Sequence, residues 1–381
     1  MHKDGHSVAI FVAFVAALAC ACGGRARGCG PAPGMTTDGE APEVMQTSTF
    51  RLVGRFDGLR FSWSGSTVEA RFTGPSLAIR LRAARVDQPT PYTAWVDDLP
   101  PVTFDVSADR ERYELATGLE PSKVHRIKIV REVEAFGGVH ELLGLDLGAG
   151  GAFLPASPRA LRIEILGDSI TCGYGVLGSG PKCPFSFATE RASEAYGARL
   201  GRALDADVTT LCWSGRGVYR NYDGSTAGTM TELFELAIPE PKVPWSFAKV
   251  PPPDVAIIAL GTNDFLGGAD QPLDLEAFEN AYVKLARRVR EVYPRALVLL
   301  TTSPMLQHAP APSTPGNVDE AARTRLEHVV ARRSAEGDSR IELVPLPNEA
   351  PHWGCDAHPD AAMNAQIAAR LESLIRSRLH P

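Results

Sequence analysis

The stretch Leu161–Val176, with the sequence LRIEILGDSITCGYGV, decides the fold of this chain. Its apolar run from Ile163 to Leu166 is short and ends at Gly167, which is typical of a strand buried in the centre of a sheet. Gly-Asp-Ser-Ile-Thr follows directly and places Ser169 in the turn at the carboxyl end of that strand. Ligands of open α/β sheets bind at this edge. Ser169 is therefore a candidate nucleophile, although a serine in such a turn can also simply cap a helix.

Three later segments place further useful groups after strands or before the last helix. They are Cys212–Gly217 (CWSGRG), Gly261–Asp264 (GTND) and Cys355–Pro359 (CDAHP). A glycine such as Gly215 lets its backbone N–H approach a ligand, and the side-chain amide of Asn263 can donate hydrogen bonds. The imidazole of His358 can act as a general base. Each residue type also has a purely structural use, so the pattern carries more information than any single position.

Around these segments, apolar runs alternate with stretches of helical periodicity. The expected strands are Ile163–Leu166, Val208–Leu211, Val255–Leu260, Ala296–Thr302 and Ile341–Val344. The expected helices are Ser193–Leu204, Met230–Ala237, Leu273–Tyr293, Asp319–Ala335 and Ala361–Leu379. This βαβ alternation predicts an α/β domain with a parallel five-stranded sheet and helices on both faces.

The order Ser169, Gly215, Asn263, His358 resembles the four sequence blocks of the GDSL or SGNH hydrolases. More narrowly, the chain resembles the family 2 carbohydrate esterases from about Phe50 to the C-terminus. The motifs that carry this resemblance are GDSITCGYG, WSGRGVYRNYDG, LGTNDF and CDAHP. This resemblance implies a flavodoxin-like SGNH domain preceded by an all-β jelly roll. It also implies a serine esterase that removes O-acetyl groups from acetylated xylan or a related polysaccharide or oligosaccharide, without a metal or organic cofactor.

The resemblance assigns a role to each of the four residues. Ser169 is the nucleophile, and His358 takes its proton and later donates it to the leaving alkoxide. The backbone N–H groups of Ser169 and Gly215 and the side chain of Asn263 are the expected donors to the oxyanion. Asp264, beside Asn263, is expected to hold its loop by backbone hydrogen bonds rather than to react.

Asp356 is a tentative third catalytic residue. The wider SGNH pattern is Asp-x-x-His, whereas this chain has Asp356-Ala357-His358, with Cys355 at the usual aspartate position. Either the Asp356 carboxylate orients the imidazole, giving a triad, or a backbone carbonyl does, giving a dyad. The short spacing favours the dyad.

The segment 50–154 has a period of two, as in Val68–Phe72 and Leu77–Arg82, punctuated by turn residues. Further strands are expected at Tyr92–Val96, Thr103–Val106, Val124–Val130 and Leu142–Leu147. These short strands predict an antiparallel sandwich, which the resemblance makes a jelly roll. Its aromatic residues Phe61, Trp63, Tyr92 and Trp95 could form a sugar-stacking platform or fill the core, and packing is the favoured interpretation.

The N-terminus reads as an export signal. Val8–Leu18 is apolar, too short to span a bilayer, and Ala17-Leu18-Ala19 before Cys20 resembles a cleavage site. Residues 1–22 are therefore a signal peptide, of either the cleaved or the lipoprotein type, with Cys20 or Cys22 lipidated in the second case. Residues 23–49 read as a flexible tether, and the hydrolase domain follows the sandwich at 155–381. The protein is expected to be exported, to the extracellular space, the cell surface or the periplasm.

Of the seven cysteines, four lie beyond the leader and tether: Cys172, Cys183, Cys212 and Cys355. In an exported chain they permit two disulfides, with three connectivities, and four separate thiols are the alternative. The expected pairs are Cys172–Cys183 and Cys212–Cys355. Neither a CxxC pair nor a histidine cluster argues for a metal site.

Composition sets limits on the partners. The chain has 381 residues, 44% of them hydrophobic, and a net charge of −6, which suits two domains with their own cores and argues against nucleic acid as a partner. We expect a monomer that acts on acetylated glycans. Two alternatives stay open: another SGNH enzyme, such as a lipase, thioesterase or acetyl transferase, and a non-catalytic glycan-binding surface protein.

Overall fold

The computed structural model describes residues 50–84, 88–268, 271–306, 317–347 and 352–379. The predicted signal peptide and tether, with Cys20 and Cys22, lie outside the described residues. Among the helices that are described, none has the length and apolar character needed to cross a bilayer.

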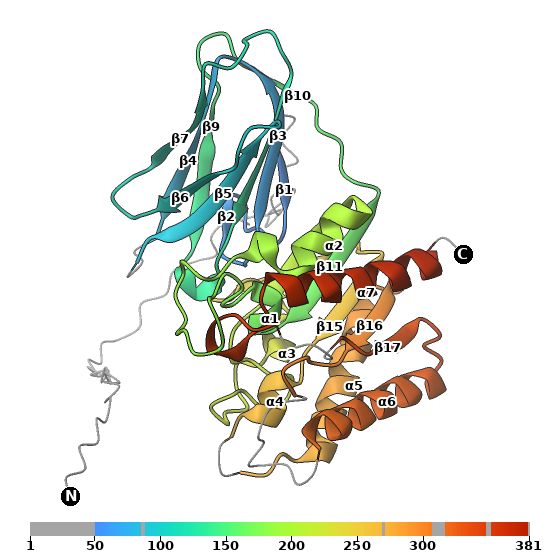
Figure 1. Ribbon diagram of the computed structural model, residues 1–381. Helices are drawn as coiled ribbons and strands as arrows, with labels where there is room; N and C mark the ends of the chain where they lie inside the picture. Colours follow the sequence, from blue (N-terminus) through green and yellow to red (C-terminus); the bar gives the residue numbers. More distant parts are fainter. Residues whose placement is uncertain (1–49, 85–87, 269–270, 307–316, 348–351, 380–381) are drawn as a thin grey trace, which may run out of the picture. The chain divides into compact units, whose positions relative to one another are not determined.

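The N-terminal domain consists of two antiparallel sheets packed face to face (Figure 1). One sheet contains β1 (Arg51–Val53), β3 (Thr67–Thr73), β5 (Thr90–Val96), β6 (Val102–Val106), β8 (His125–Arg131) and β10 (Ala152–Leu154). The other contains β2 (Arg60–Phe61), β4 (Ser76–Ala83), β7 (Arg112–Thr117) and β9 (His140–Asp146). The strand orders are β1-β3-β8-β5-β6, with β10 beside β3, and β2-β9-β4-β7. The predicted all-β sandwich is confirmed, and it contains four strands that were not predicted: β1, β2, β7 and β10.

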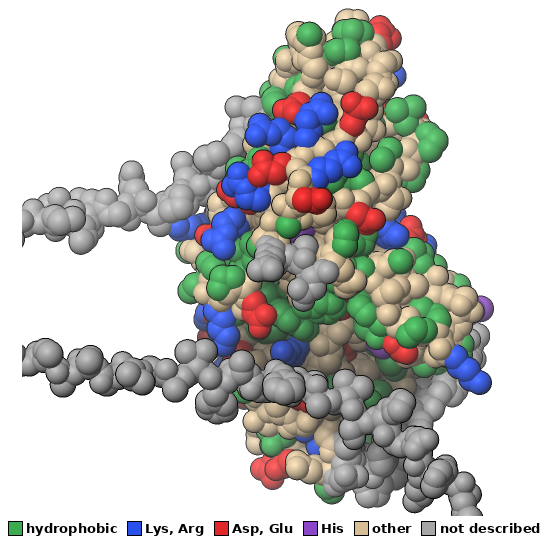
Figure 2. Space-filling view, turned by 90° about the vertical axis from the view of Figure 1, so that its left-hand side faces the viewer, with side chains coloured by type: hydrophobic (Ala, Val, Ile, Leu, Met, Phe, Trp, Pro, Cys, Tyr) green, Lys and Arg blue, Asp and Glu red, His purple; other side chains and the backbone are tan. Residues whose placement is uncertain are grey.

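Alternation along β4 shows how the sandwich forms. Leu77, Ile79 and Leu81 are fully buried in a core shared by both sheets, whereas Arg80 and Arg82 are exposed. On the outer surface, ion pairs such as that of Arg82 on β4 with Glu141 on β9 join neighbouring strands. On the face shown in Figure 2, acidic and basic side chains accordingly mix rather than gather into a patch of one sign.

Three of the four aromatic residues considered as a sugar platform are buried: Phe61 and Tyr92 in the sandwich core, and Trp63 in the apolar core that α5 and α6 share with the parallel sheet. Phe61, Trp63 and Tyr92 are no more than 2% exposed, and the Tyr92 hydroxyl lies 2.7 Å from His140 Nδ1. Trp95 is partly exposed. The packing interpretation therefore holds for three of the four residues.

The C-terminal domain is built on a parallel sheet with the order β12-β11-β15-β16-β17. Its strands are β11 (Leu161–Gly167), β12 (Ala206–Cys212), β15 (Val255–Ala259), β16 (Leu297–Thr301) and β17 (Ile341–Val344). This confirms the predicted five-stranded parallel sheet. The strand order reverses at β11, and ligands of open α/β sheets bind at the carboxyl end of such a switch point.

Helices cover both faces of this sheet (Figure 1). The side chains of α2 (Tyr196–Leu204) and α7 (Ala361–Leu379) share one apolar core with the sheet, and those of α5 (Leu275–Val292) and α6 (Val318–Ala335) share the other. Asp274 and Asn317 are the N-caps of α5 and α6: their side-chain oxygens accept hydrogen bonds from backbone N–H groups of the first turn, which fixes where each helix begins.

The predicted helix Met230–Ala237 is wrong in its second half. α3 covers only Met230–Leu233, and Leu236–Ile238 forms β13, which pairs with β14 (Val243–Pro244). The physical reason is a buried arginine of the sandwich, Arg55, whose guanidinium donates to the backbone carbonyls of Phe234 and Leu236. A continuing helix would use those carbonyls itself.

Arg55 also joins the two domains by a buried ion pair. Its Nη2 lies 3.0 Å from Glu164 Oε1 on β11, and Tyr293 donates to the same carboxylate oxygen at 2.8 Å. Both charged side chains are almost fully buried, so each depends on the other for its partner.

Candidate active site

β11 and its two neighbours bring Ser169, Gly215 and Asn263 to the same edge of the sheet, at the carboxyl ends of the strands. In the parallel register, Gly167 of β11 lies opposite Cys212 of β12 and Ala259 of β15. The loops that follow these strands carry Ser169, Gly215 and Asn263 respectively. Ser169 begins the short α1 (Ser169–Cys172), which Asp168 caps by accepting from Ile170 N at 3.1 Å. Asn263 lies in α4 (Thr262–Leu266).

His358 reaches the serine from the far end of the chain. Its Nε2 lies 2.8 Å from Ser169 Oγ, which is hydrogen-bond distance for a nucleophile and its base. Ser169 is only 5% exposed. Desolvation by the surrounding side chains lowers the pKa of His358 to about 4, so the imidazole is neutral at pH 7 and can accept a proton.

The other ring nitrogen of His358 fixes its tautomer. Nδ1 lies 3.1 Å from the backbone carbonyl oxygen of Asp356. A carbonyl can only accept, so Nδ1 carries the hydrogen and Nε2 presents its lone pair to Ser169. Asp356 and the following Ala357 have φ of 49° and 55°, and this left-handed turn lies directly before the histidine.

The Asp356 carboxylate is engaged elsewhere. Its Oδ2 accepts from the Tyr174 hydroxyl at 2.7 Å and from Phe185 N at 3.1 Å. Of the two alternatives that the sequence left open, the geometry follows the dyad, in which a backbone carbonyl orients the imidazole. The tentative assignment of the Asp356 side chain as a third member of the catalytic group is not what the structure shows.

Tyr174 is a site residue to which the sequence analysis gave no role, although it stands within the block GDSITCGYG. Its ring stacks on His358 with centroids 4.0 Å apart, and Phe185 stacks on Tyr174 at 4.3 Å. The imidazole is thus held at Nδ1 by a carbonyl and on one face by an aromatic ring. In the sequence, only the position of Tyr174, five residues after the candidate nucleophile, could have indicated that it lies in the site.

Three N–H donors are available for an oxyanion. Ser169 N is the first amide of α1, a position without an acceptor in its own helix. Gly215 has φ of 77°, and within the described residues its N–H has no hydrogen-bond acceptor. Asn263 Nδ2 donates one hydrogen to the Arg216 carbonyl at 3.0 Å, which orients the amide and leaves its second hydrogen for a ligand.

Asp264 is the residue that holds these loops together. Its buried carboxylate accepts from the backbone N–H groups of Val218, Tyr219 and Arg220 at 2.8–3.0 Å. Asp264 makes the expected backbone hydrogen bonds, and the partners of its carboxylate lie in the loop after β12 rather than beside Asn263. It ties the loop after β12 to the helix that carries Asn263.

The predicted disulfide pairing is wrong. Cys172 pairs with Cys212, with Cα atoms 5.6 Å apart, and Cys183 pairs with Cys355, with Cα atoms 4.6 Å apart. The first pair forms because α1 follows β11 and Cys212 ends the adjacent β12, so neighbouring strands bring the two cysteines together. The second forms because the loop after α1 returns to the histidine segment, where Asp356 N donates to the Cys183 carbonyl.

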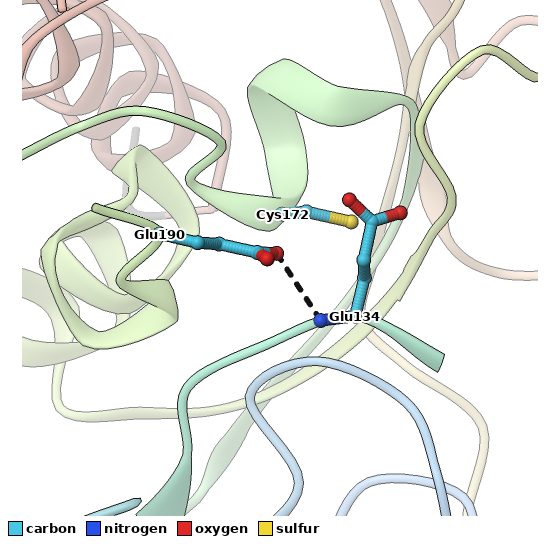
Figure 3. A group of neighbouring side chains, drawn as sticks. All are labelled: Glu134, Cys172 and Glu190. Carbon is cyan, nitrogen blue, oxygen red and sulfur yellow. Dashed lines mark hydrogen bonds between the residues drawn. The ribbon is translucent and has the colours of Figure 1, made fainter. Parts of the chain in front are cut away.

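One group of potential metal ligands lies behind the site. Glu134, Cys172 and Glu190 have ligand atoms within 4.8 Å of one another, and Figure 3 shows the two carboxylates beside the sulfur. The Cys172 sulfur is bonded to Cys212 and cannot act as a thiolate. Glu134 accepts two hydrogen bonds from Ser214. The donor set therefore does not fit a metal ion while the Cys172–Cys212 disulfide is intact.

Two family models match the chain in tandem. Residues 52–157 match the N-terminal domain of carbohydrate esterase family 2, and residues 165–381 match the GDSL-like lipase/acylhydrolase family. Among characterised relatives, the cellulase/esterase CelE of Acetivibrio thermocellus is 31% identical over 333 residues, which are 86% of this chain. This chain spans only 39% of that relative's length.

Another relative and a solved structure match over most of their length. An acetylxylan esterase / glucomannan deacetylase of Cellvibrio japonicus is 27% identical over 84% of both chains. A family two carbohydrate esterase from Clostridium thermocellum, solved in complex with cellohexaose, is 30% identical, with a TM-score of 0.78, over 87% of this chain and 99% of its own. With both domain models matched in tandem and this structural agreement, the chain belongs to the GDSL-like lipase/acylhydrolases and, within them, to the family 2 carbohydrate esterases.

Proposed function

We propose that this protein is a serine esterase that removes O-acetyl groups from carbohydrate, such as acetylated xylan or a related polysaccharide or oligosaccharide. The observation that carries the proposal is the 2.8 Å contact between Ser169 Oγ and His358 Nε2 at the switch point of the sheet. The names of the relatives, acetylxylan esterase and glucomannan deacetylase, support the choice of substrate class.

In the proposed reaction, Ser169 Oγ attacks the acetyl carbonyl carbon while neutral His358 takes the hydroxyl proton. The negative charge that develops on the carbonyl oxygen is stabilised by the N–H groups of Ser169 and Gly215 and by the amide of Asn263. His358 then gives its proton to the sugar oxygen as the C–O bond breaks. The sugar leaves with a free hydroxyl, and the acetyl group stays on Ser169.

Water completes the cycle by the same groups. His358 takes a proton from a water molecule that attacks the acetyl-serine, and the same donors bind the second oxyanion. Collapse of this intermediate returns the proton to Ser169 Oγ and releases acetate. Throughout, the carbonyl of Asp356 accepts from Nδ1–H, which keeps the imidazole oriented and stabilises it when it is charged.

Aromatic side chains around the site suit a sugar substrate. Tyr174 and Phe185 form a stacked pair beside His358, and Phe136 of the sandwich domain contacts Phe185 and Trp213 with ring centroids 6.1 and 6.4 Å apart. Phe136 is 42% exposed although it is large and apolar. Exposed aromatic rings that border a reactive serine offer flat apolar surfaces to the faces of pyranose rings.

The experiment that tests the proposal is acetate release from acetylated xylan and acetylated oligosaccharides by the purified protein, with Ser169→Ala as the blank. Long-chain p-nitrophenyl esters, acyl thioesters and alcohol acceptors run alongside distinguish a lipase, a thioesterase and an acetyl transferase. Acetate release that needs Ser169 and exceeds hydrolysis of long-chain esters is expected. Binding of acetylated glycan without any hydrolysis would instead identify a glycan-binding protein.

We also propose that the protein is exported, as its N-terminal sequence indicates. Two disulfides in the catalytic domain suit an oxidising compartment. Mass spectrometry of the mature protein tests this: a start at Cys20 or Cys22 with an added lipid mass identifies the anchored form, and an unmodified shortened start identifies the secreted form. An intact residue 1 would contradict export.

A further inference from the structure

A buried carboxylate of the sandwich domain reaches into the loop that carries Gly215. Glu134 lies between β8 and the 3-10 helix at Ala135–Gly137, and its side chain is fully buried. Its Oε2 accepts from Ser214 N at 2.6 Å, and its Oε1 accepts from Ser214 Oγ. Ser214 is the residue directly before Gly215, so this contact is one peptide away from an oxyanion donor.

The geometry of that loop makes the contact consequential. Arg216 N donates to the Trp213 carbonyl at 3.2 Å, so Ser214 and Gly215 are the two central residues of a β-turn. The φ of 77° at Gly215 is the value of a type II turn, whereas a type I turn has about −90° there. The two types differ by a flip of the central peptide, and that peptide contains the Gly215 N–H. Holding Ser214 by its N–H and its hydroxyl fixes the residue from which this peptide extends, and so limits the directions in which the Gly215 N–H can point.

Glu134 is itself held from both sides. Its backbone N–H donates to Glu190 Oε1 at 3.1 Å, drawn as the dashed line in Figure 3, and its carbonyl accepts from Arg131 Nη2 at 3.1 Å. Glu190 and Arg131 are fully buried. The backbone of Glu134 is thus held between Arg131 of the sandwich and Glu190 of the catalytic domain.

We propose that Glu134 is a positioning residue of the oxyanion hole, through which the sandwich domain sets the direction of the Gly215 N–H. This rests on the proposed esterase function. The sandwich domain then does more than place Phe136 beside the site, because one of its side chains helps to aim a donor at the developing negative charge.

The contact survives a change in the charge of Glu134. Burial, together with the nearby Asp168 carboxylate, raises the pKa of Glu134 to about 7. The protonated acid can accept from Ser214 N with one oxygen and donate to Ser214 Oγ with the other, because a hydroxyl both accepts and donates. A glutamine can make the same two bonds with its carbonyl and amide groups.

The chain offers a matched control in Glu132. Its carboxylate also accepts from the N–H and hydroxyl of one serine, Ser193, both at 2.8 Å, and it also crosses from the sandwich to the catalytic domain. Ser193 lies in the 3-10 helix at Ala192–Glu194 and not in the oxyanion loop. Glu132→Ala thus removes an equivalent contact without touching the turn at Gly215.

The test measures kcat and KM for p-nitrophenyl acetate, with melting temperatures, for Glu134→Ala, Glu134→Gln and Glu132→Ala. We expect Glu134→Ala to lose about 10²-fold in kcat, near the effect of removing one oxyanion donor, with KM changed less than about threefold. Glu134→Gln should stay within about tenfold of wild type, by the same comparison. Glu132→Ala should lower the melting temperature and leave kcat within about threefold.

Several outcomes would overturn the inference. They are equal kcat losses in Glu134→Ala and Glu132→Ala, a loss that falls entirely on KM, or a loss in Glu134→Gln as large as in Glu134→Ala. If Glu134→Ala does not fold, Glu134→Asp replaces it, since the shorter side chain cannot make both bonds and should also lower kcat. Wild type and Ser169→Ala are included: an inactive wild type refutes the proposed function, whereas an active wild type with an unaffected Glu134→Ala refutes only this inference.

Discussion

Replacing Asp356 by asparagine should have little effect on catalysis, although this aspartate stands two residues before the proposed base. Both bonds of its side chain, from the Tyr174 hydroxyl and from Phe185 N, go to one oxygen, Oδ2. The carbonyl oxygen of asparagine can occupy that position and accept both. The bond to His358 Nδ1 comes from the backbone and is unchanged by the substitution.

The magnitude follows from what the carboxylate loses. The substitution removes a negative charge on an exposed side chain, where water reduces its interaction with the charged imidazole to about 1 kcal/mol or less. That corresponds to about fivefold in rate. When a carboxylate bonded directly to the imidazole becomes an amide, the loss is about 10⁴-fold. The two mechanisms differ by roughly three orders of magnitude in kcat, so the measurement separates them clearly.

The assay is kcat and the pH profile of kcat/KM on an acetyl ester for wild type, Asp356→Asn and Asp360→Asn. Asp360 is a matched control, because its side chain caps α7 by accepting from Ala362 N and Met363 N, a function asparagine also performs. We expect both variants to lose less than about tenfold. A folded Asp356→Asn variant that loses 10³-fold or more, with Asp360→Asn unaffected, would refute the dyad.

Ser169→Ala and His358→Ala should each lower kcat by about 10⁴-fold or more; activity within tenfold of wild type in either folded variant would sink the assignment. Asn263→Ala should lose about 10²–10³-fold in kcat with a small change in KM, and a loss confined to KM would place Asn263 in substrate binding. Because burial lowers the pKa of His358 to about 4 and only the neutral imidazole accepts a proton, kcat/KM should persist below pH 6 and fall about tenfold per pH unit below about pH 4. A fall of kcat/KM with an apparent pKa near 6.5 that is caused by protonation of His358 would contradict this.

The part of the site that depends on the parallel sheet could be predicted from the sequence. Ser169, Gly215 and Asn263 each follow an apolar run, and parallel neighbours end at the same edge whatever their exact register. The family blocks then supplied their roles. His358 could be chosen among nine histidines because a proline and a long helix follow it.

The disulfides show where reasoning along the chain failed. Cys212 and Cys355 were expected to pair because each stands three residues before a candidate site residue, Gly215 or His358, but strand order decides the connectivity. Once β12 is placed beside β11, Cys172 and Cys212 are neighbours, and the Cys183–Cys355 pair is what remains. The strands that became β11 and β12 were predicted correctly, but the disulfide prediction did not consider that they are neighbours in the sheet.

The orientation of His358 depends on backbone dihedrals that residue types alone do not reveal. Asp356 and Ala357 both have positive φ. Such a backbone is found mainly in glycine, asparagine and aspartate, so it could not be expected at an alanine. The Cys183–Cys355 disulfide and the bond from Asp356 N to the Cys183 carbonyl hold this turn in place. The short Asp-x-His spacing indicated that the carboxylate would be elsewhere, but not that it would bind Tyr174.

The sandwich domain was the least predictable contributor to the site, because its contribution consists of single polar contacts. Arg55, Glu132 and Glu134 are ionisable residues of the sandwich domain, and all three are fully buried. A buried charge without its partner is costly, so each of these residues requires the second domain in place. Glu134 differs from the other two because its partner is Ser214, directly before Gly215. The same burial that makes the two domains depend on each other for stability therefore also connects the sandwich to the chemistry.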